Sequence, residues 1–393
     1  MRARELGIPL DGRAGRWNAI TDVPGVEVGY VTLQEGEDVR TGVTAILPRG
    51  RTGVGTPCAA GWHSFNGNGE MTGTTWIEES GSLAVPVLIT NTYAVGPVHR
   101  GVVDWVRENR TDMAPEWLLP VVTETWDGHL NDIHGDRVRP AHAAEAIEAA
   151  ASGPVAEGNV GGGTGMRCYG FKGGSGTASR EVAYGADTYS VGAFVQANFG
   201  ARRELVIAGM PMGGWLPQSE QAAGDSGEGP DAGRPLPDGA GSVIVVVGTD
   251  APLLPGQCKA LARRVPLGLA RTGTTGSHFS GDIFLAFSTA NEGALTSLFP
   301  PGDDTDDGGA DGANAPYESM RFIPWGRMDI LYTAVVEAVE EAVLNVLTAA
   351  EPMTGRAGHH VPALPLAEVA KLLPTSAPMI PSPHSGRGLW MTQ

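Results

Sequence analysis

The serine at position 242 could act as a nucleophile, because it stands where a glycine-rich segment meets an apolar strand. It follows Gly241 and begins the run SVIVVVGTD. A serine hydroxyl in mid-chain is inert without a base. If the Gly241-Ser242 bond were cut, Ser242 would carry an α-amine with an ordinary pKa of roughly 7.7 to 8.0, able to take the proton of the hydroxyl. One residue would then supply both nucleophile and base.

The same hydroxyl could cut the bond itself, by attacking the Gly241 carbonyl to give an ester that water hydrolyses. Glycine suits the position before a scissile bond, because it tolerates backbone geometries that are closed to other residues. The competing interpretation is a serine that simply opens a strand after a glycine turn. Spacing alone favours that simpler interpretation.

Other nucleophile and metal patterns are excluded by their spacing. The nearest approach to a G-x-S-x-G elbow, GGSGT around Ser175, ends in threonine, and no H-E-x-x-H occurs. The pair His359-His360 lies in a Pro/Gly-rich tail and is interpreted as a surface pair. The glycine groups GNVGGGTGM and GFKGGSGT lack the complete phosphate-loop and dinucleotide patterns and predict tight turns at strand ends. Three scattered cysteines predict neither a disulfide framework nor a zinc site.

The elements that must position Ser242 are short β-branched strands and amphipathic helices in blocks. This favours stacked sheets covered by helices over a doubly wound parallel sheet. The run after Ser242 is apolar enough for the centre of a sheet. Because only the preceding half can complete that sheet, residues 1–393 are predicted to form one interleaved domain, with a linker at 218–241. The expected strands are 25–33, 42–48, 84–92, 187–200, 204–211, 242–250 and 282–291, and the expected helices are 95–109, 140–153, 255–271 and 327–351.

Charge and hydropathy exclude two classes of partner. The formal net charge is −17, from 27 basic and 44 acidic residues, which argues against binding a nucleic-acid backbone. No apolar signal region and no run of about 18 apolar residues occurs, which predicts a soluble, cytoplasmic protein without a membrane partner. One acidic loop is interpreted as solvated rather than as a calcium site, because it lacks the EF-hand order. Its acids are Asp303, Asp304, Asp306, Asp307 and Asp311.

Seven segments in order resemble the autoprocessing L-aminopeptidase/D-esterase family, which includes the β-peptidyl aminopeptidases. They are NAITDVPGVEVGYVTL, NGNGEMTG, ETWDGHLNDIHG, GFKGGSGTASR, SVGAFVQANFG, GSVIVVVGTDAPLLPGQCKALARRVPLGLARTG and SGDIFLAFSTAN. The resemblance implies an α/β fold, a four-layer αββα sandwich like that of N-terminal-nucleophile hydrolases. It also implies the different connectivity of the aminopeptidase/ornithine acetyltransferase fold.

The resemblance also assigns catalytic roles. Ser242 matches the residue that becomes the new N-terminus and attacks the substrate carbonyl. Ser280 matches a second serine that contacts the nucleophile and its amine. Asp282 matches an acidic position that is glutamate in β-peptidyl members, where it would hold the Ser242 ammonium or orient Ser280. Residues two apart in a strand share one face, so both can point into one site.

Three further positions follow from the same resemblance. Asn198 matches the side-chain donor of the oxyanion hole, since an amide stabilises negative charge without ionising; an asparagine at a strand-to-turn boundary is the alternative. Glu124 matches the carboxylate that receives the α-amine of the substrate. Trp126 occupies a substrate-binding position that is tyrosine in aminopeptidase members.

The other matched motifs leave structural and functional roles open. Asn66, Asn68 and Glu70 could line the pocket or cap strands, and Asn131 and Asp132 could belong to the site or form a turn. Lys172 and Arg180 are expected to be solvated or ion-paired at the surface. Cys168 and Cys258 are expected to fill small spaces in the core.

The resulting hypothesis is a self-cleaving serine aminopeptidase that acts on short peptides, amides or esters with a free amino group. Cleavage would give an α-chain, 1–241, and a β-chain, 242–393. This chemistry requires no metal or organic cofactor, and the resemblance implies a homo-oligomer of αβ units. The alternatives are an acyltransferase of the ornithine acetyltransferase type, although those use threonine, and a binding homologue that is never cut.

Overall fold

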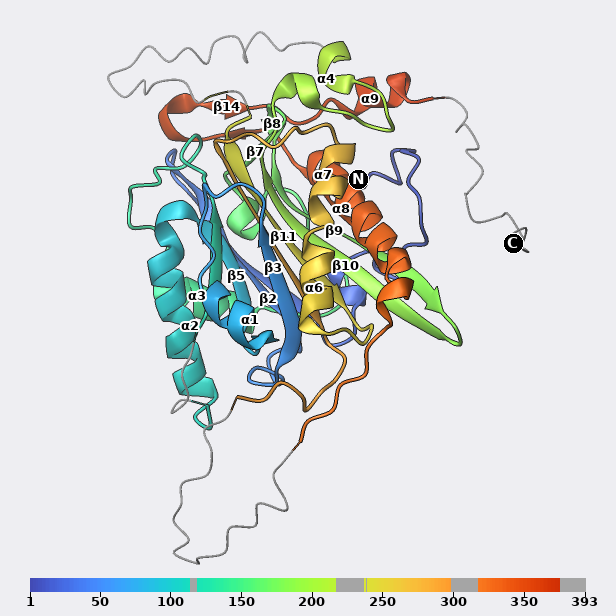
Figure 1. Ribbon diagram of the computed structural model, residues 1–393. Helices are drawn as coiled ribbons and strands as arrows, with labels where there is room; N and C mark the ends of the chain where they lie inside the picture. Colours follow the sequence, from blue (N-terminus) through green and yellow to red (C-terminus); the bar gives the residue numbers. More distant parts are fainter. Residues whose placement is uncertain (114–118, 217–236, 238, 298–316, 375–393) are drawn as a thin grey trace, which may run out of the picture.

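Two facing β-sheets with helices on their outer sides make up the fold (Figure 1). The computed structural model describes residues 1–113, 119–216, 237, 239–297 and 317–374. Three large clusters of buried hydrophobic residues fill the spaces between the layers: helices against the first sheet, sheet against sheet, and the second sheet against helices. The predicted αββα sandwich is therefore confirmed.

The first sheet has four strands in the order β1-β2-β5-β6, and its β5–β6 pair is parallel. Helices α2 and α3 cover its outer face, where Trp105 and Ala143 join the hydrophobic cluster. The helix predicted at 95–109 is α2 itself. The bounds are β1 Glu27–Glu35, β2 Val39–Leu47, β5 Val87–Asn91, β6 Val121–Thr125, α2 Val95–Asn109 and α3 Pro140–Glu148.

The second sheet has six strands in the order β4-β3-β12-β11-β10-β9, so strands from beyond position 241 lie between strands from before it. Helices α6, α7 and α8 cover its outer face (Figure 1). The bounds are β3 Cys58–Ser64, β4 Ser82–Leu83, β9 Gly174–Tyr184, β10 Asp187–Asn198, β11 Gly241–Thr249, β12 Ser280–Ser288, α6 Pro255–Ala262, α7 Val265–Arg271 and α8 Asp329–Ala349.

Short elements complete the described part of the chain. Two of them, β7 and β8, form a tight hairpin that packs beside the end of β10. The bounds are α1 Thr74–Ser80, β7 Arg167–Cys168, β8 Phe171–Lys172, α4 Met212–Trp215, β13 Met353–Thr354, β14 His360–Val361 and α9 Leu366–Leu372.

Strand β11 is buried on both faces, as its apolar run predicts. Val243, Val245 and Val247 pack in the cluster under the helices, whereas Ile244 and Val246 pack between the two sheets. Such alternation leaves neither face for a polar residue along the middle of the strand. Its two polar residues, Ser242 and Thr249, stand near its beginning and at its end.

Two predictions about regular elements are wrong. The segment 204–211 is not a strand: Ala208 and Gly209 have positive φ angles and fold it into a tight turn, with Ile207 bridged to Met210. The helix expected at 255–271 is broken into α6 and α7. Pro266 lies in the first turn of α7, where its missing N–H and its ring prevent α6 from continuing.

The glycine group GFKGGSGT forms a turn only in part. Gly170 lies in the turn of the β7–β8 hairpin, but Gly174 and Gly176 lie within β9, which the sequence does not reveal. A Cβ atom on Gly176 would lie 2.4 Å from the Ala342 carbonyl oxygen of α8. Glycine is therefore needed there for close packing of helix on sheet.

The surface positions predicted for Lys172 and Arg180 are also wrong, since both side chains are buried. Arg180 forms ion pairs with Glu337 and Glu341 of α8, so its charge is compensated inside the protein. Cys168 and Cys258 are buried, as expected for residues that fill the core. His359 is half-buried and its ring stacks on that of His129, so it is not part of a simple surface pair.

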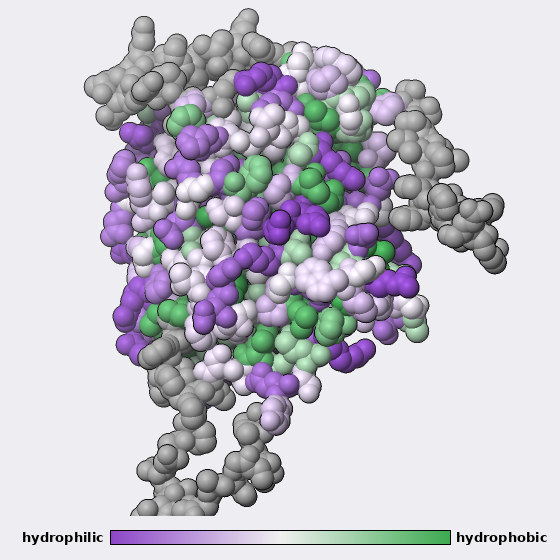
Figure 2. Space-filling view, in the orientation of Figure 1, coloured by the Kyte–Doolittle hydropathy of each residue, from purple (hydrophilic) through white to green (hydrophobic). Residues whose placement is uncertain are grey.

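The acidic loop at 303–311 and most of the linker at 218–241 lie outside the described residues. On the face seen in Figure 2, hydrophobic residues are interspersed with hydrophilic ones. Within the described ranges, no helix is both long enough and apolar enough to cross a membrane.

Replacing Gly176 with alanine should lower the free energy of unfolding by about 1–3 kcal/mol, because its methyl group would overlap the α8 backbone. Urea unfolding followed by circular dichroism measures this change. Gly96→Ala, in α2, is the matched control: its Cβ meets nothing within 4 Å, so stability should stay equal or rise slightly. Equal urea midpoints for both variants would contradict the packing argument.

Candidate active site

The hydroxyl of Ser242 lies buried at the point where β11 meets the end of β6. Its side chain is 2% exposed, and the backbone N–H of Trp126 donates a hydrogen bond to its Oγ at 3.1 Å. In the antiparallel β10–β11 pair, Ser242 stands opposite Asn198. The structure thus brings together three residues that lie far apart in the sequence.

The side-chain amide of Asn198 is held in one orientation. The N–H of Arg167 donates to its Oδ1 at 2.9 Å, and its Nδ2 donates to the Trp126 carbonyl oxygen at 2.8 Å. An amide nitrogen carries two N–H donors, so one remains available for a substrate. The orientation follows from the partners: a flipped amide would place an acceptor against a carbonyl and a donor against an N–H.

Trp126 contacts the site through its backbone. Its N–H donates a hydrogen bond to Ser242, and its C=O accepts one from Asn198. Its indole ring packs against Gly128, where a Cβ atom would lie 2.5 Å from the ring. These backbone contacts do not depend on the side chain. An indole can therefore occupy this position, where the resemblance implies a tyrosine.

Gly241 fits its position because there is no room for a side chain. A Cβ atom would lie 1.9 Å from the carbonyl oxygen of Asn198, well inside contact distance. The Gly241 N–H also donates to the Phe279 carbonyl at 3.2 Å. The residue before Ser242 is therefore fixed between β10 and the entry to β12.

Ser280 and Asp282 point to the same side of β12, as their spacing predicts. Ser280 Oγ donates to Asp282 Oδ1 at 2.5 Å. The parallel β11–β12 register places Ser280 beside Gly241 and places Gly281 beside Ser242. The pair therefore adjoins the peptide bond before Ser242, on the opposite face of the sheet from the Ser242 hydroxyl.

The carboxylate of Asp282 is buried but well supplied with donors. Burial raises its pKa, and hydrogen bonds from Ser280 and Asn66 act in the opposite direction. Asn66 Nδ2 donates to Asp282 Oδ2 at 3.0 Å, and Asn66 Oδ1 accepts from the Asp282 N–H at 2.6 Å. The role of Asn66, open from the sequence, is thus to hold Asp282.

Glu124 lies in β6, two residues before Trp126, and is 3% exposed. Its Oε1 accepts from the Glu70 N–H at 3.1 Å, and its Oε2 accepts from the Thr92 hydroxyl at 2.5 Å. Burial raises its pKa. A carboxylate accepts about four hydrogen bonds, so acceptor positions remain. Neither the Glu70 backbone nor Thr92 carries a sequence signal for this role.

Another buried carboxyl group braces the chain after Trp126. Asp127 is fully buried, which raises its pKa to about 7, and Asn131 donates to its Oδ1 at 3.0 Å. Asn131 Oδ1 also accepts from the Arg40 N–H. These contacts assign Asn131 to the support of the loop rather than to the site.

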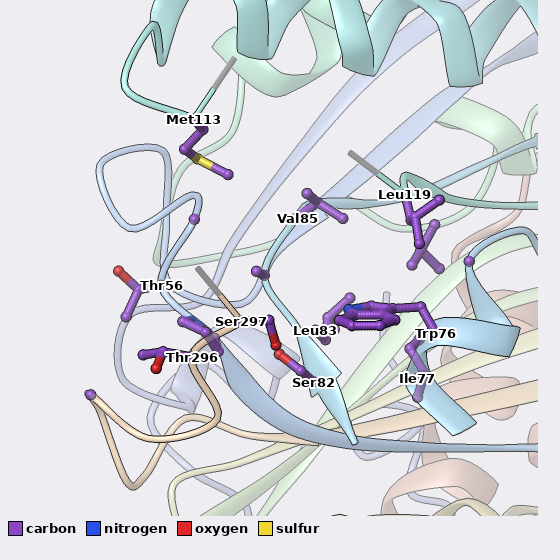
Figure 3. A pocket seen from close by; sticks show the side chains of 16 residues that line it. Thr56, Trp76, Ile77, Ser82, Leu83, Val85, Met113, Leu119, Thr296 and Ser297 are labelled. Atoms are coloured by element: carbon purple, nitrogen blue, oxygen red, sulfur yellow. The ribbon is translucent and has the colours of Figure 1, made fainter. Parts of the chain in front are cut away.

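A cavity of about 130 Å³ adjoins the candidate site. Trp126 and Asn198 line it together with Gly239 and Ala240, which precede the Gly241-Ser242 bond. A larger apolar cavity of about 350 Å³ lies elsewhere, between α1, β4 and Met113 (Figure 3), and none of the candidate site residues lines it. In the described ranges, no group of three or more His, Cys, Asp or Glu side chains is arranged to bind a metal ion.

An αββα sandwich of this kind, with similarity to known aminopeptidases, defines the class: the protein is an aminopeptidase, a hydrolase with the N-terminal-nucleophile type of fold. The chain belongs to peptidase family S58, whose model matches residues 18–361. The resemblance inferred from the seven sequence segments is therefore confirmed.

Three relatives illustrate the similarity. The chain is 48% identical over 389 residues to β-peptidyl aminopeptidase BapA of Sphingosinicella microcystinivorans, covering 95% of this chain and 91% of the relative. The L-aminopeptidase D-Ala-esterase/amidase of Ochrobactrum anthropi superposes with a TM-score of 0.81 at 43% identity, over 94% and 96% of the two chains. A Burkholderia sp. β-aminopeptidase superposes with a TM-score of 0.80 at 45% sequence identity, and the match covers 94% of this chain and 98% of that chain.

Replacing Asn66 with alanine should move the acidic limb of the pH–rate profile to higher pH by about 1 unit. Its hydrogen bond lowers the pKa of Asp282, so its loss raises that pKa further and the carboxylate is lost at a higher pH. The measurement is kcat/KM against pH with an aminoacyl amide. Asn68→Ala, an exposed neighbour in the same loop, should leave the limb in place. If the acidic limb of the pH–rate profile of Asn66→Ala lies at the same pH as in the unaltered protein, Asp282 does not control that limb.

Proposed function

We propose that the chain cuts itself between Gly241 and Ser242, and that Ser242 then removes N-terminal residues from short peptides, amides or esters. The contact that carries the proposal is the hydrogen bond from the Trp126 N–H to Ser242 Oγ at 3.1 Å. It holds the hydroxyl at the end of a rigid strand beside an amide donor, Asn198. The products are an α-chain, residues 1–241, and a β-chain, residues 242–393.

The first reaction is an acyl shift. Ser242 Oγ attacks the Gly241 carbonyl carbon, the C–N bond breaks, and the hydroxyl proton passes to the departing nitrogen. Water then hydrolyses the ester, which leaves a carboxylate on Gly241 and an amine on Ser242. The tight packing of Gly241 against the Asn198 carbonyl supports this step, because it fixes the peptide group that is attacked.

The second reaction uses the new amine as the base. It takes the proton of the Ser242 hydroxyl, which attacks the substrate carbonyl, and returns that proton to the leaving group. The free N–H of Asn198 stabilises the oxyanion. Ser280 and Asp282, which adjoin the position of Gly241, hold the new ammonium between turnovers and orient it.

Glu124 makes the enzyme an exopeptidase, because a buried carboxylate near Ser242 receives the α-ammonium of the substrate. Among the described residues its hydrogen-bond partners are a backbone N–H and a hydroxyl, and none of them carries a positive charge. The acyl group that reaches Ser242 is consequently the first residue of the substrate. The relatives are named for β-peptidyl substrates and for L-amino acid and D-Ala substrates, so both kinds belong in a substrate panel.

The cut protein is proposed to form homo-oligomers of αβ units in the cytoplasm. Three buried free cysteines agree with a reducing compartment. The oligomer follows from the family resemblance, and size-exclusion chromatography with light scattering measures it. The negative net charge gives no support for a nucleic-acid partner.

Ser242→Ala should abolish both self-cleavage and aminopeptidase activity, because it removes the nucleophile of both reactions. Intact-mass measurement of the unaltered protein should give species of about 25 and 16 kDa, with the smaller beginning at Ser242, against 40.8 kDa for the variant. Ser277→Ala, a serine in the loop before β12, should still be cut. A single full-length species from the unaltered chain would overturn the proposal.

Glu124→Gln should lower kcat/KM for substrates with a free α-amine by about 10- to 100-fold, because a charge-assisted hydrogen bond is lost. An N-acetylated ester, which has no ammonium, should lose no more than about two-fold. Glu70→Gln is the matched control, since the hydrogen bond from Glu70 to Glu124 is donated by its backbone N–H and survives the substitution. An equal loss on both substrates would assign Glu124 a structural role.

A further inference from the structure

The proposed mechanism leaves a buried lysine without a role. Lys172 of β8 has no exposed surface, and its three donors point to backbone carbonyls. Nζ lies 2.9 Å from the Met166 oxygen, 2.9 Å from the Gly173 oxygen and 3.5 Å from the Gly163 oxygen. Burial lowers its pKa to about 7.

The contrast with Arg180 shows that Lys172 is a special case. Arg180 is equally buried but has two carboxylates as partners, whereas the described partners of Lys172 are neutral. A buried charge without a counter-ion costs free energy that a methionine of similar length would not cost. The charge therefore requires an explanation beyond packing.

One peptide group joins Lys172 to Asn198. The carbonyl of Met166 accepts from Lys172 Nζ, and the N–H on the other side of the same peptide bond, that of Arg167, donates to Asn198 Oδ1 at 2.9 Å. Arg167 and Lys172 also face each other in the β7–β8 hairpin. The hairpin is fixed to β10 by the Tyr169 N–H, which donates to the Phe199 carbonyl.

We propose that Lys172 is a positioning residue that orients and polarises the Asn198 amide through the Met166–Arg167 peptide group. This inference rests on the proposed function, in which Asn198 stabilises the oxyanion. The Nζ–H donor, most strongly in its ammonium form, draws electron density toward the Met166 oxygen, which makes the Arg167 N–H a stronger donor. That N–H in turn draws density toward Asn198 Oδ1, so the Nδ2 protons become stronger donors to an oxyanion. Hydrogen bonds in such a chain strengthen one another.

The same chain determines which end of the amide faces the substrate. Lys172 fixes the peptide group, so the Arg167 N–H points at the Asn198 side chain and can be accepted only by its Oδ1 atom. The Nδ2 atom must then face Trp126 and Ser242. Without that constraint, only the Trp126 carbonyl orients the amide, which rotates more readily and can present an acceptor to the oxyanion. Lys172 thus acts on the transition state without touching the substrate.

The kinetic test is Lys172→Met, with Cys168→Ala in the same hairpin as a control for packing. After cleavage has been verified by intact mass and rates are normalised to the cut fraction, Lys172→Met should lower kcat about 10- to 100-fold. KM should change less than about two-fold, because the ground state does not use the oxyanion hole. Cys168→Ala should keep kcat. A kcat within about three-fold of the unaltered enzyme would overturn the proposal.

A second measurement does not require activity. In uncut Ser242→Ala protein labelled with ¹⁵N-asparagine, the side-chain NH₂ resonances of Asn198 are assigned by their loss in Asn198→Asp. They should shift when Lys172 is also replaced, while those of distant asparagines stay; unmoved resonances would overturn the proposal. If Lys172→Met does not fold, Lys172→Gln serves in both tests. Activity retained by Ser242→Ala would instead refute the proposed function and leave this test intact.

Discussion

The hydrogen-bond register of β10, β11 and β12 determines where the groups of the site lie, because the pairing fixes which residue of one strand lies beside which residue of the next. Asn198 stands opposite Ser242, Gly281 stands beside Ser242, and Ser280 stands beside Gly241. A shift of one residue would turn the hydroxyl toward the helices and bring Val243 into its place. Such a shift is opposed by the whole of β11, whose alternate residues fill two different hydrophobic clusters. The cores on both faces of the sheet thus position the chemistry at its end.

Buried charges in this molecule are stabilised either by an opposite charge or by neutral hydrogen-bond partners. Away from the site, Arg180 and Glu341 neutralise each other directly. In the site, Glu124 and Asp282 are bonded by hydroxyl, amide and backbone N–H donors, which stabilise a carboxylate without cancelling its charge. A site that receives an ammonium, as proposed here, requires this arrangement, because a resident cation would compete with the substrate.

The sequence predicts the sandwich and several elements well, because the signals are local: α2 appears at its predicted bounds, and the apolar run after Ser242 indicates a central strand. The candidate site residues come from motifs, and most of them do converge. What could not be predicted depends on contacts that carry no local pattern. The Trp126 contribution is made by the backbone, and the burial of Lys172 depends on a hairpin that packs against β10. At 204–211, a turn at Ala208 and Gly209 overrides an apolar, β-prone composition.

The placement of β11 and β12 between β3 and β10 has a consequence for unfolding. Once the chain is cut as proposed, the two polypeptides remain paired on both sides of the central β11–β12 pair, through β10 and β3, and neither can leave without breaking both ladders. An uncut chain refolds in a unimolecular reaction, but two separated chains must first meet, so recovery becomes second order and depends on concentration. After self-cleavage, folding is in practice irreversible. The mature enzyme stays folded because the barrier to unfolding and dissociation is high, and not because it refolds easily.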